Sequence, residues 1–243
     1  MATSNQENIE KNKVQAGTTE QNTSFRKNPT IKKYMPYLLV VLILAIAYSM
    51  GGCIVKNYKF VIGKEYYDEG DYEEAIEYFS EAVERGDVMA QYYLAECYLK
   101  TDDDILEAID LCRKAANKGI PEAQFLLGKC YDEDLVGKWQ YNDAKAMKWY
   151  RKAAKQGFPE AQYKLAVHYE TGAGVALNFQ KALKYYREAA RLGHKEALFR
   201  LGQCYYDGEG VEKNLKEAVE WWTKAAEKGH AEAKQALSKC QVQ

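Results

Sequence analysis

Apolar residues recur along most of the chain in columns that have a helical spacing. One column of large apolar residues returns every 32 to 38 residues, and a small residue follows each member. Its members are Ile62, Leu94, Leu127, Leu165, Leu201 and Leu237. Two columns of alanine run seven residues apart, a separation of two helical turns that places each pair on one helix face. They comprise Ala75, Ala108, Ala146, Ala182 and Ala218, and Ala82, Ala115, Ala153, Ala189 and Ala225.

These columns predict helix hairpins in which large residues of one helix fill the spaces left by small residues of its neighbour. A single hairpin leaves one apolar face uncovered, and the next hairpin in the stack covers it. We therefore expect an all-α fold, a right-handed α/α superhelical solenoid over residues 56–243. The expected units are residues 58–87, 88–120, 121–158, 159–194 and 195–230, followed by a capping helix at residues 231–240.

The unit at residues 159–194 carries motifs that resemble the Sel-one-like repeat. They are PEAQYKLA at residues 159–166, the turn GAGV at residues 172–175 and KALKYYREAA at residues 181–190. The unit at residues 195–230 is equally similar and has the turn Gly208-Glu209-Gly210-Val211. Five units in register make this resemblance specific.

The segment GKEYYDEGDYEEAIEYFSEA at residues 63–82 resembles instead the shorter tetratricopeptide repeat. The units at residues 88–120 and 121–158 keep the helical columns but lack the Gly-x-Gly-Val turn. The combined resemblance extends over residues 58–240. It implies a scaffold or adaptor that binds a protein or peptide in a concave groove lined by the first helices of the repeats.

The first 55 residues lack the repeat columns. Residues 1–33 are polar and are expected to form a disordered tail. Residues 34–55 contain no charged side chain, and about twenty helical residues span a hydrocarbon core of about 30 Å. We therefore expect a single transmembrane helix at residues 34–55, which would tether the repeats to a membrane.

Two other interpretations of the apolar run remain open. Ala45-Ile46-Ala47 resembles a signal-peptide cleavage site, and Met50-Gly51-Gly52-Cys53 resembles a bacterial lipoprotein box. The flanks favour a cytoplasmic tail, because four basic residues precede the run and three follow it. The repeats would then lie on the non-cytoplasmic side, periplasmic or extracytoplasmic.

The charge distribution argues against nucleic-acid binding. The formal net charge of the chain is −1, and the basic excess lies in the tail, which has six Lys or Arg against three Glu. The repeats therefore carry a net negative charge and lack the basic stripe that a phosphate backbone requires.

Four of the six cysteines occupy one repeat position, which would suggest a zinc row. Cys97, Cys130, Cys204 and Cys240 share it, and His168 fills it in the remaining unit. Equivalent positions in successive hairpins lie about 10 Å apart, whereas zinc ligands lie about 2.3 Å from the metal. We therefore expect small core residues, with no metal site in this row. A bridge from Cys97 to Cys112 is also not expected, because the two lie about 6 Å apart along the hairpin axis.

No catalytic motif stands out in the repeats, and no enzymatic activity or cofactor is expected. The turns at residues 172–175 and 208–211 join helix to helix, so their glycines serve the turn and not a nucleotide. The alternative function follows from the resemblance, since some members of the family are described as weak β-lactamases. An envelope enzyme or cell-wall-ligand protein of that type would need a serine with a lysine three residues on, and the match Ser24 to Lys27 lies in the tail.

Candidate contact residues follow from the positions two and five residues after the large apolar column, which should face the groove. The side chains of Tyr67, Leu99, Glu170 and Tyr206 are expected to support no neighbouring residue. The candidates for partner binding are Tyr67, Glu96, Leu99, Lys129, Asp132, Glu170, Gln203 and Tyr206.

Two sets of aromatic residues compete with these candidates. The doublets lie between the alanine columns and are expected in or beside the core. They are Tyr78-Phe79, Trp149-Tyr150, Tyr185-Tyr186 and Trp221-Trp222. A second column precedes the large apolar column by two residues, either lining the groove or packing on the adjacent repeat. It comprises Phe60, Tyr92, Phe125, Tyr163 and Phe199.

Overall fold

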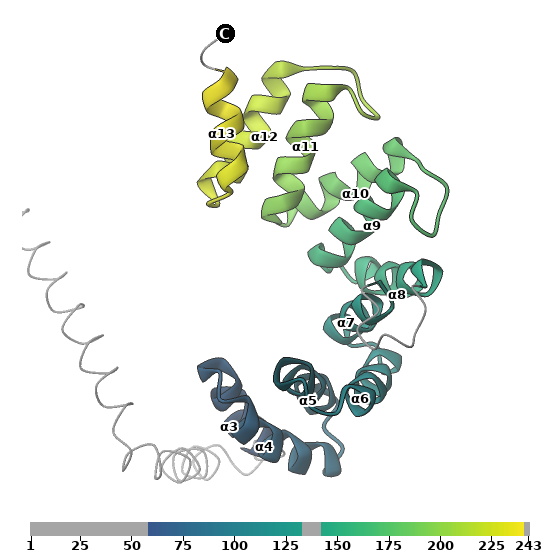
Figure 1. The fold of residues 1–243 in the computed structure, drawn as a ribbon, viewed down its shortest axis with the longest axis vertical. Helices are drawn as coiled ribbons and strands as arrows, with labels where there is room; N and C mark the ends of the chain where they lie inside the picture. The colour runs from purple at the N-terminus through teal and green to yellow at the C-terminus, as the bar shows by residue number, and fades with distance from the viewer. Residues whose placement is uncertain (1–57, 133–141, 241–243) are drawn as a thin grey trace, which may run out of the picture. The chain divides into compact units, whose positions relative to one another are not determined.

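A computed structural model of the chain describes residues 58–132 and 142–240 (Figure 1). The expected polar tail and the expected membrane helix at residues 34–55 lie outside these ranges. Among the helices that the structure does describe, none combines the length and the hydropathy needed to cross a bilayer.

Every regular element in the described ranges is an α-helix, which confirms the all-α prediction. The chain divides into two compact units, with the boundary between Tyr78 and Phe79. The first unit holds α3 (Tyr58–Glu69) and the start of α4 (Tyr72–Glu84). Within it, the rings of Tyr66 and Tyr78 stack with their centroids 5.4 Å apart.

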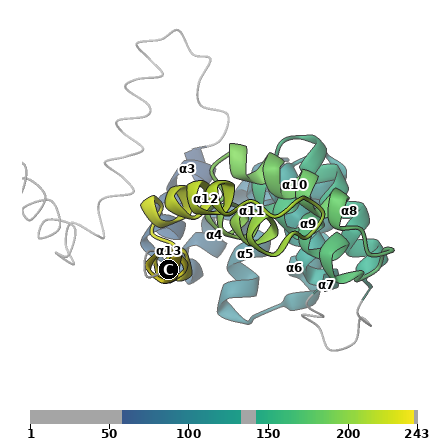
Figure 2. The same ribbon diagram turned by 90° about the horizontal axis from the view of Figure 1, so that it is seen from above.

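The second unit is a stack of helix hairpins that follow one another in chain order (Figure 1, Figure 2). Each hairpin packs its two helices together, and its second helix packs on the first helix of the next hairpin. This is the repeat solenoid that the apolar columns predict. The elements are α5 (Val88–Thr101), α6 (Ile105–Asn117), α7 (Pro121–Asp132), α8 (Asp143–Lys155), α9 (Pro159–Thr171), α10 (Phe179–Arg191), α11 (Lys195–Asp207), α12 (Leu215–Glu227) and α13 (Ala231–Cys240).

The core of the second unit pairs large aromatic rings with glycines. A Cβ atom at Gly128 would lie 2.5 Å from the Tyr150 ring, and one at Gly202 would lie 2.4 Å from the Trp222 ring. Tyr150 is fully buried and Trp222 is 4% exposed. The glycines therefore allow a bulky side chain of the second helix to lie directly on the backbone of the first, as the alternation of large and small columns predicts.

The Gly-x-Gly-Val turns connect three helices and not only two. Gly172 ends α9 and Gly208 ends α11, both in the left-handed region with φ of 77° and 81°. The second glycine of each turn, Gly174 or Gly210, lies against the second helix of the preceding hairpin. A Cβ atom at Gly174 would meet the backbone of Asp143, and one at Gly210 would lie 2.7 Å from the Phe179 carbonyl oxygen. Each turn thus packs on the start of the second helix of the preceding repeat.

Three of the five rings of the second aromatic column pack on the following repeat or on α13. Each of the three lies against the residue that precedes and caps the next first helix or α13. The centroid distances are 5.3 Å for Phe125 and Phe158, 4.7 Å for Tyr163 and His194, and 4.3 Å for Phe199 and His230. These rings stabilise the stacking of successive helices.

Three cysteines of the row lie in the core, as predicted, whereas Cys240 is half-buried. Cys97, Cys130 and Cys204 are at most 4% exposed, and Cys97 and Cys112 are both free thiols. Burial raises the pKa of Cys97 to about 12 and that of Cys204 to about 12. These thiols therefore stay protonated and act as small apolar residues.

Candidate functional site

The eight predicted contact residues all lie on first helices of hairpins. Tyr67 is on α3, Glu96 and Leu99 are on α5, Lys129 and Asp132 on α7, Glu170 on α9, and Gln203 and Tyr206 on α11. Seven of them are half-buried, and Tyr206 is 47% exposed. The structure places some of these side chains in contact with their own hairpin and others beside a cavity.

The expectation that a side chain supports no neighbour, made for four of the eight, is wrong for Tyr67, Glu170 and Tyr206. The Tyr67 ring lies 5.5 Å from the ring of Tyr72. The Tyr150 hydroxyl donates to Asp132 Oδ2 at 3.1 Å, and the Tyr186 hydroxyl donates to Glu170 Oε2 at 2.8 Å. The Tyr206 ring packs on Trp222 with a centroid distance of 5.4 Å. The physical reason is the size of the buried ring on the second helix, whose outer edge reaches the groove side of the first helix.

The hydroxyl of Tyr186 is held in its donor form. Burial raises its pKa, and the nearby Glu170 carboxylate raises it further because a phenolate beside a carboxylate would be repelled. The hydrogen bond from Tyr186 to Glu170 therefore persists across the physiological pH range. Asp132 and Glu170 are partly exposed, and each also accepts a hydrogen bond from a buried tyrosine of its own hairpin.

Gln203 and Tyr206 line a cavity between α11, α12 and α13. Its volume is about 370 Å³, and its aromatic walls come from Phe199, Tyr206 and Trp222. The remaining lining residues are polar or small, namely Gln203, Asp207, Glu232, Gln235, Ala236, Lys239 and Cys240. Apolar walls with a few polar groups at the rim are typical of ligand pockets.

The floor of this cavity is held in place by hydrogen bonds. The Trp222 indole Nε1 donates to the Phe199 carbonyl oxygen at 3.2 Å, which fixes the indole against α11. Arg200 donates to Gln203 Oε1 at 3.0 Å. The cavity is therefore a preformed feature of the last hairpin and α13, and not a gap left by loose side chains.

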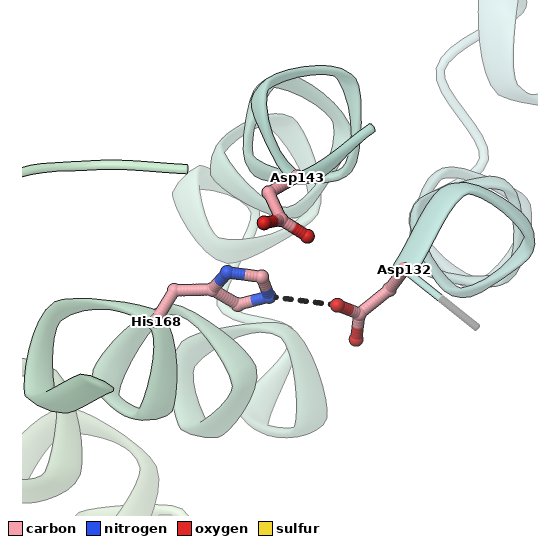
Figure 3. Close-up of side chains that lie close together, drawn as sticks. All are labelled: Asp132, Asp143 and His168. Carbon is pink, nitrogen blue, oxygen red and sulfur yellow. Dashed lines mark ion pairs between the residues drawn. The ribbon is translucent and has the colours of Figure 1, made fainter. Parts of the chain in front are cut away.

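A second group of functional side chains meets where α7, α8 and α9 come together, and we call it the His168 cluster. It consists of Asp132 at the end of α7, Asp143 at the start of α8 and His168 on α9 (Figure 3). His168 Nε2 lies 3.1 Å from Asp132 Oδ1. One oxygen or nitrogen from each of the three residues lies within 4.8 Å of the others.

Both partners of the close contact have further hydrogen bonds. His168 Nδ1 lies 2.9 Å from the carbonyl oxygen of Ala173, in the turn after α9. Asp132 Oδ2 also lies 3.1 Å from the Lys164 ammonium group. His168 is 3% exposed, so its imidazole is almost fully removed from water.

The pKa values of the pair shift in opposite directions. Burial alone would lower the pKa of His168, but hydrogen bonds to Asp132 and to the Ala173 carbonyl, with the charges of Asp132 and Asp143, outweigh burial and raise it. Burial would raise the pKa of Asp132, but hydrogen bonds from His168 and Lys164 outweigh it and hold the pKa well below its ordinary value. Each group thus favours the charged form of the other.

The equivalent position one repeat later carries a different set of groups. Glu170, Cys204 and Glu209 bring one acceptor or donor atom each to within 4.8 Å of one another. Here Glu170 accepts from Tyr186, and Cys204 is a neutral thiol because burial raises its pKa to about 12. This second group therefore lacks a ready metal ligand at its centre.

The role of His168 in this cluster was not predicted, although one signal pointed to it. His168 is the one histidine in a row that holds Cys97, Cys130, Cys204 and Cys240, and Asp132 stands at a predicted groove position in the preceding repeat. The spacing of the cysteine row excludes a metal shared by equivalent positions of successive hairpins. His168 instead lies near a carboxylate of the preceding hairpin and near the first residue of α8.

Stacked helix hairpins with aligned alanine and leucine columns define a class of helical-repeat proteins, and comparisons specify which one. The model of the Sel1 repeat matches residues 121–158, 159–194 and 195–230, and the model of the tetratricopeptide repeat matches residues 60–123. A Sel1 repeat protein from Oxalobacter formigenes is 31% identical, with 74% of each chain covered and a TM-score of 0.68. The chain belongs to the Sel1 repeat family.

Two further solved structures have the same fold. A protective antigen of uropathogenic Escherichia coli strains with an SLR fold is 26% identical, with a TM-score of 0.67. The chain covers 41% of that protein, and 79% of the chain is covered. A Sel1 repeat protein from Klebsiella pneumoniae is 20% identical, with 79% and 94% covered and a TM-score of 0.53, and it shows the fold alone. The comparison with curated proteins found no match.

Proteins built from Sel1 and tetratricopeptide repeats are generally protein-interaction scaffolds, and their fold is typically not enzymatic. The chain shares that architecture over its described residues.

Proposed function

We propose that this protein is a membrane-tethered interaction scaffold that binds a peptide segment of a partner protein in the cavity between α11, α12 and α13. The observation that carries this proposal is the position of Gln203 and Tyr206, which belong to the predicted groove set and also line the cavity. A tyrosine beside a preformed pocket with aromatic walls and a polar rim is typical of protein-binding sites.

The chemistry of the cavity indicates the kind of segment that it would accept. Phe199, Tyr206 and Trp222 offer a surface for one large apolar side chain. The carboxylates of Asp207 and Glu232 stand against the single ammonium group of Lys239, so the rim favours a positive charge. The proposed ligand is therefore a peptide with an aromatic or branched aliphatic residue next to Lys or Arg.

Tethering to a membrane is the second part of the proposal. The uncharged run at residues 34–55 has the length of a bilayer span, and the basic residues before it favour a cytoplasmic tail. The repeats would then present the cavity on the non-cytoplasmic side. Reporter fusions at the C-terminus test this orientation, and fusions active only in the cytoplasm would contradict it.

Selection from a random displayed peptide library on the immobilised full chain tests the binding site. We expect enrichment of an apolar residue adjacent to Lys or Arg. Tyr206→Ala should weaken binding of the enriched peptide by tenfold or more, roughly the cost of a hot-spot residue. Leu215→Ala is the matched control, because Leu215 is 52% exposed in the same hairpin and lies outside the cavity lining.

Two changes at the rim test the charge preference. Glu232→Ala should weaken the basic peptide, and Lys239→Ala should strengthen it, since each changes the charge facing the ligand. Lys234→Ala is the control, because Lys234 is an exposed lysine of α13 outside the lining. A peptide whose affinity responds to none of the three cavity changes would overturn this assignment of the site.

A further inference from the structure

The three side chains of the His168 cluster converge from three helices. Figure 3 shows the two carboxylates and one edge of the imidazole facing a common space. One potential ligand atom from each residue lies within 4.8 Å of the others. From this geometry we propose that Asp132, Asp143 and His168 form a binding site for one divalent transition-metal ion. The site is separate from the cavity at α13, and the proposal does not depend on the proposed function.

The imidazole is oriented as a metal ligand requires. The Ala173 carbonyl oxygen can only accept a hydrogen bond, so His168 Nδ1, at 2.9 Å, carries the hydrogen. When the imidazole is neutral, Nε2 is the nitrogen with the lone pair, and it faces Asp132 and not solvent. A metal ion would then take the place of the proton that Nε2 shares with Asp132 in the ion pair. A backbone carbonyl that binds the second ring nitrogen is the common way in which proteins fix the tautomer of a ligating histidine.

The turn after α9 supports this arrangement. Ala173 supplies the carbonyl oxygen, and the neighbouring Gly174 packs directly on the backbone of Asp143 at the start of α8. The Gly172-Ala173-Gly174 segment thus positions two of the three proposed ligands. No side chain at residue 174 would permit this approach, since an added Cβ atom would lie 2.8 Å from the Asp143 carbonyl carbon.

The carboxylate of Asp132 divides its two oxygens between different tasks. Oδ2 accepts from the Tyr150 hydroxyl and pairs with the Lys164 ammonium group, both at 3.1 Å. Oδ1 faces His168 Nε2. Tyr150 and Lys164 therefore hold the carboxylate in place from behind and leave one oxygen as a ligand.

The distances fit a small ion with a modest adjustment. Zinc lies about 2.0–2.2 Å from nitrogen and oxygen ligands, so two ligands of a tetrahedral site are about 3.3 Å apart. The separation of Nε2 and Oδ1 is 3.1 Å, close to this value. Asp143 is the first residue of α8 and is half-buried, so a rotation of its side chain can bring an oxygen into range. Water would complete the fourth position.

The donor set selects the class of metal. One imidazole nitrogen with two carboxylate oxygens suits Zn²⁺ and its neighbours such as Co²⁺, because imidazole favours these ions over Mg²⁺. Mg²⁺ prefers oxygen ligands and retains much of its water. The competing occupant of the space between Nε2 and Oδ1 is a proton, which would make the contact a simple ion pair.

Titration calorimetry of the full chain with Zn²⁺, after treatment with a chelator and dialysis, tests the proposal. We expect a site whose affinity falls at least tenfold in Asp143→Asn and in His168→Gln, and no comparable site for Mg²⁺. Glu209→Gln is the matched control, since it removes an acid from the group of Glu170, Cys204 and Glu209 one repeat later, and it should bind zinc as the unaltered chain does.

Cysteine thiols are the main alternative zinc ligands, and the absorption spectrum of bound Co²⁺ separates them from the proposed site. A site of nitrogen and oxygen ligands has no thiolate charge-transfer band. If His168→Gln fails to fold, Asp143→Asn still tests the site, because Asp143 is only half-buried and its replacement should leave the fold intact. Circular dichroism shows whether each variant is folded. Absence of zinc binding, binding equal in all variants, or a thiolate band would show that Asp132 and His168 form an ion pair only.

Discussion

Two junctions between consecutive hairpins share one arrangement of helices and differ in their chemistry. We call them the α9 junction, where α9 packs on the preceding hairpin of α7 and α8, and the α11 junction, where α11 packs on the hairpin of α9 and α10. At the α9 junction, the residues on the preceding hairpin and on α9 are charged or polar. At the α11 junction, the equivalent residues are an acid that bonds within its own hairpin, an aromatic residue and a thiol. The equivalent sets are Asp132, Asp143 and His168 at the α9 junction, and Glu170, Phe179 and Cys204 at the α11 junction.

The difference shows what the position of His168 and Cys204 demands. Both side chains are at most 4% exposed, so a polar group there must have partners. The thiol of Cys204 stays neutral and needs none. The imidazole of His168 has Asp132 Oδ1 on one nitrogen and the Ala173 carbonyl on the other. Asp132 is also one methylene shorter than Glu170, which leaves more room for the larger ring.

A first prediction concerns the ring that both junctions share, and it has the largest expected effect. Tyr150→Ala and Tyr186→Ala should each lower the free energy of unfolding by about 3–5 kcal/mol, because each removes a fully buried aromatic side chain. Chemical denaturation measures both. The Tyr→Phe changes are the controls and should cost about 0.5–1.5 kcal/mol, the value of one hydrogen bond. Costs for the two alanine variants below 1 kcal/mol would contradict the shared core role.

A second prediction separates the two acids. Asp132→Ala leaves the imidazole of His168 and the ammonium group of Lys164 without their carboxylate. It should cost about 2–4 kcal/mol, less than for a fully buried pair because the Asp132 side chain is 16% exposed. Glu170→Ala removes the acceptor of Tyr186 and should cost about 1–2 kcal/mol. Equal costs in denaturation would mean that His168 adds nothing to the α9 junction.

A third prediction converts one junction toward the other. Cys204→His should cost about 1–3 kcal/mol, because an imidazole overpacks a position that now holds a thiol. Adding Glu170→Asp shortens the facing acid, as at the α9 junction, and should recover part of that loss. A double-mutant cycle measures the coupling, and it should favour the double variant by about 0.5 kcal/mol or more. Strict additivity would show that the match of acid and histidine is not what permits the imidazole.

The hairpins and their order were predictable from the sequence, and the physical reason is visible at Gly128 and Gly202. Each glycine lies under a ring of the second helix, so the large and small positions recur wherever a hairpin forms. The turn glycines at residues 172 and 208 were equally readable, since a left-handed residue ends each helix. The glycines in the hairpins and in the turns depend only on the spacing of residues along the chain and on the helix that follows in the same hairpin.

The contacts of the predicted groove residues were not predictable in the same way. Asp132 meets His168 across 36 positions of sequence, and the contact depends on how two hairpins stack. Glu170 and Tyr206 were expected to be free of neighbours, but Tyr186 and Trp222 reach them from the second helix. Gln203 and Tyr206 do line a cavity, since α13 packs on α12 and supplies the remaining wall. Their role in partner binding stays a prediction.

The last prediction concerns pH and has the smallest expected effect, but it distinguishes the junctions by sign. The pKa of His168 is raised, so its contribution to stability is full below its ordinary pKa of 6.5 and is lost as the pH rises through the folded-state value. His194, which caps α11, has a lowered pKa, because burial disfavours its charged form. Its contribution is present above 6.5 and is lost as the pH falls.

The physical origin of the second dependence is the helix cap. His194 Nδ1 accepts a hydrogen bond from the Ala197 amide at 3.2 Å, and protonation of that nitrogen would remove the acceptor. His194→Asn keeps a good capping residue without a titrating group, so its melting temperature should fall less than that of the unaltered chain on acidification. His168→Gln should differ most from the unaltered chain at mildly acid pH and approach it as the pH rises. Melting curves from about pH 5 to about pH 9 in a chelator measure both, and the range spans the titration of histidine. If the melting temperatures of both variants changed with pH as that of the unaltered chain does, neither histidine would couple stability to pH. Differences of opposite sign would show that His168 stabilises the chain at low pH and that His194 stabilises it at high pH.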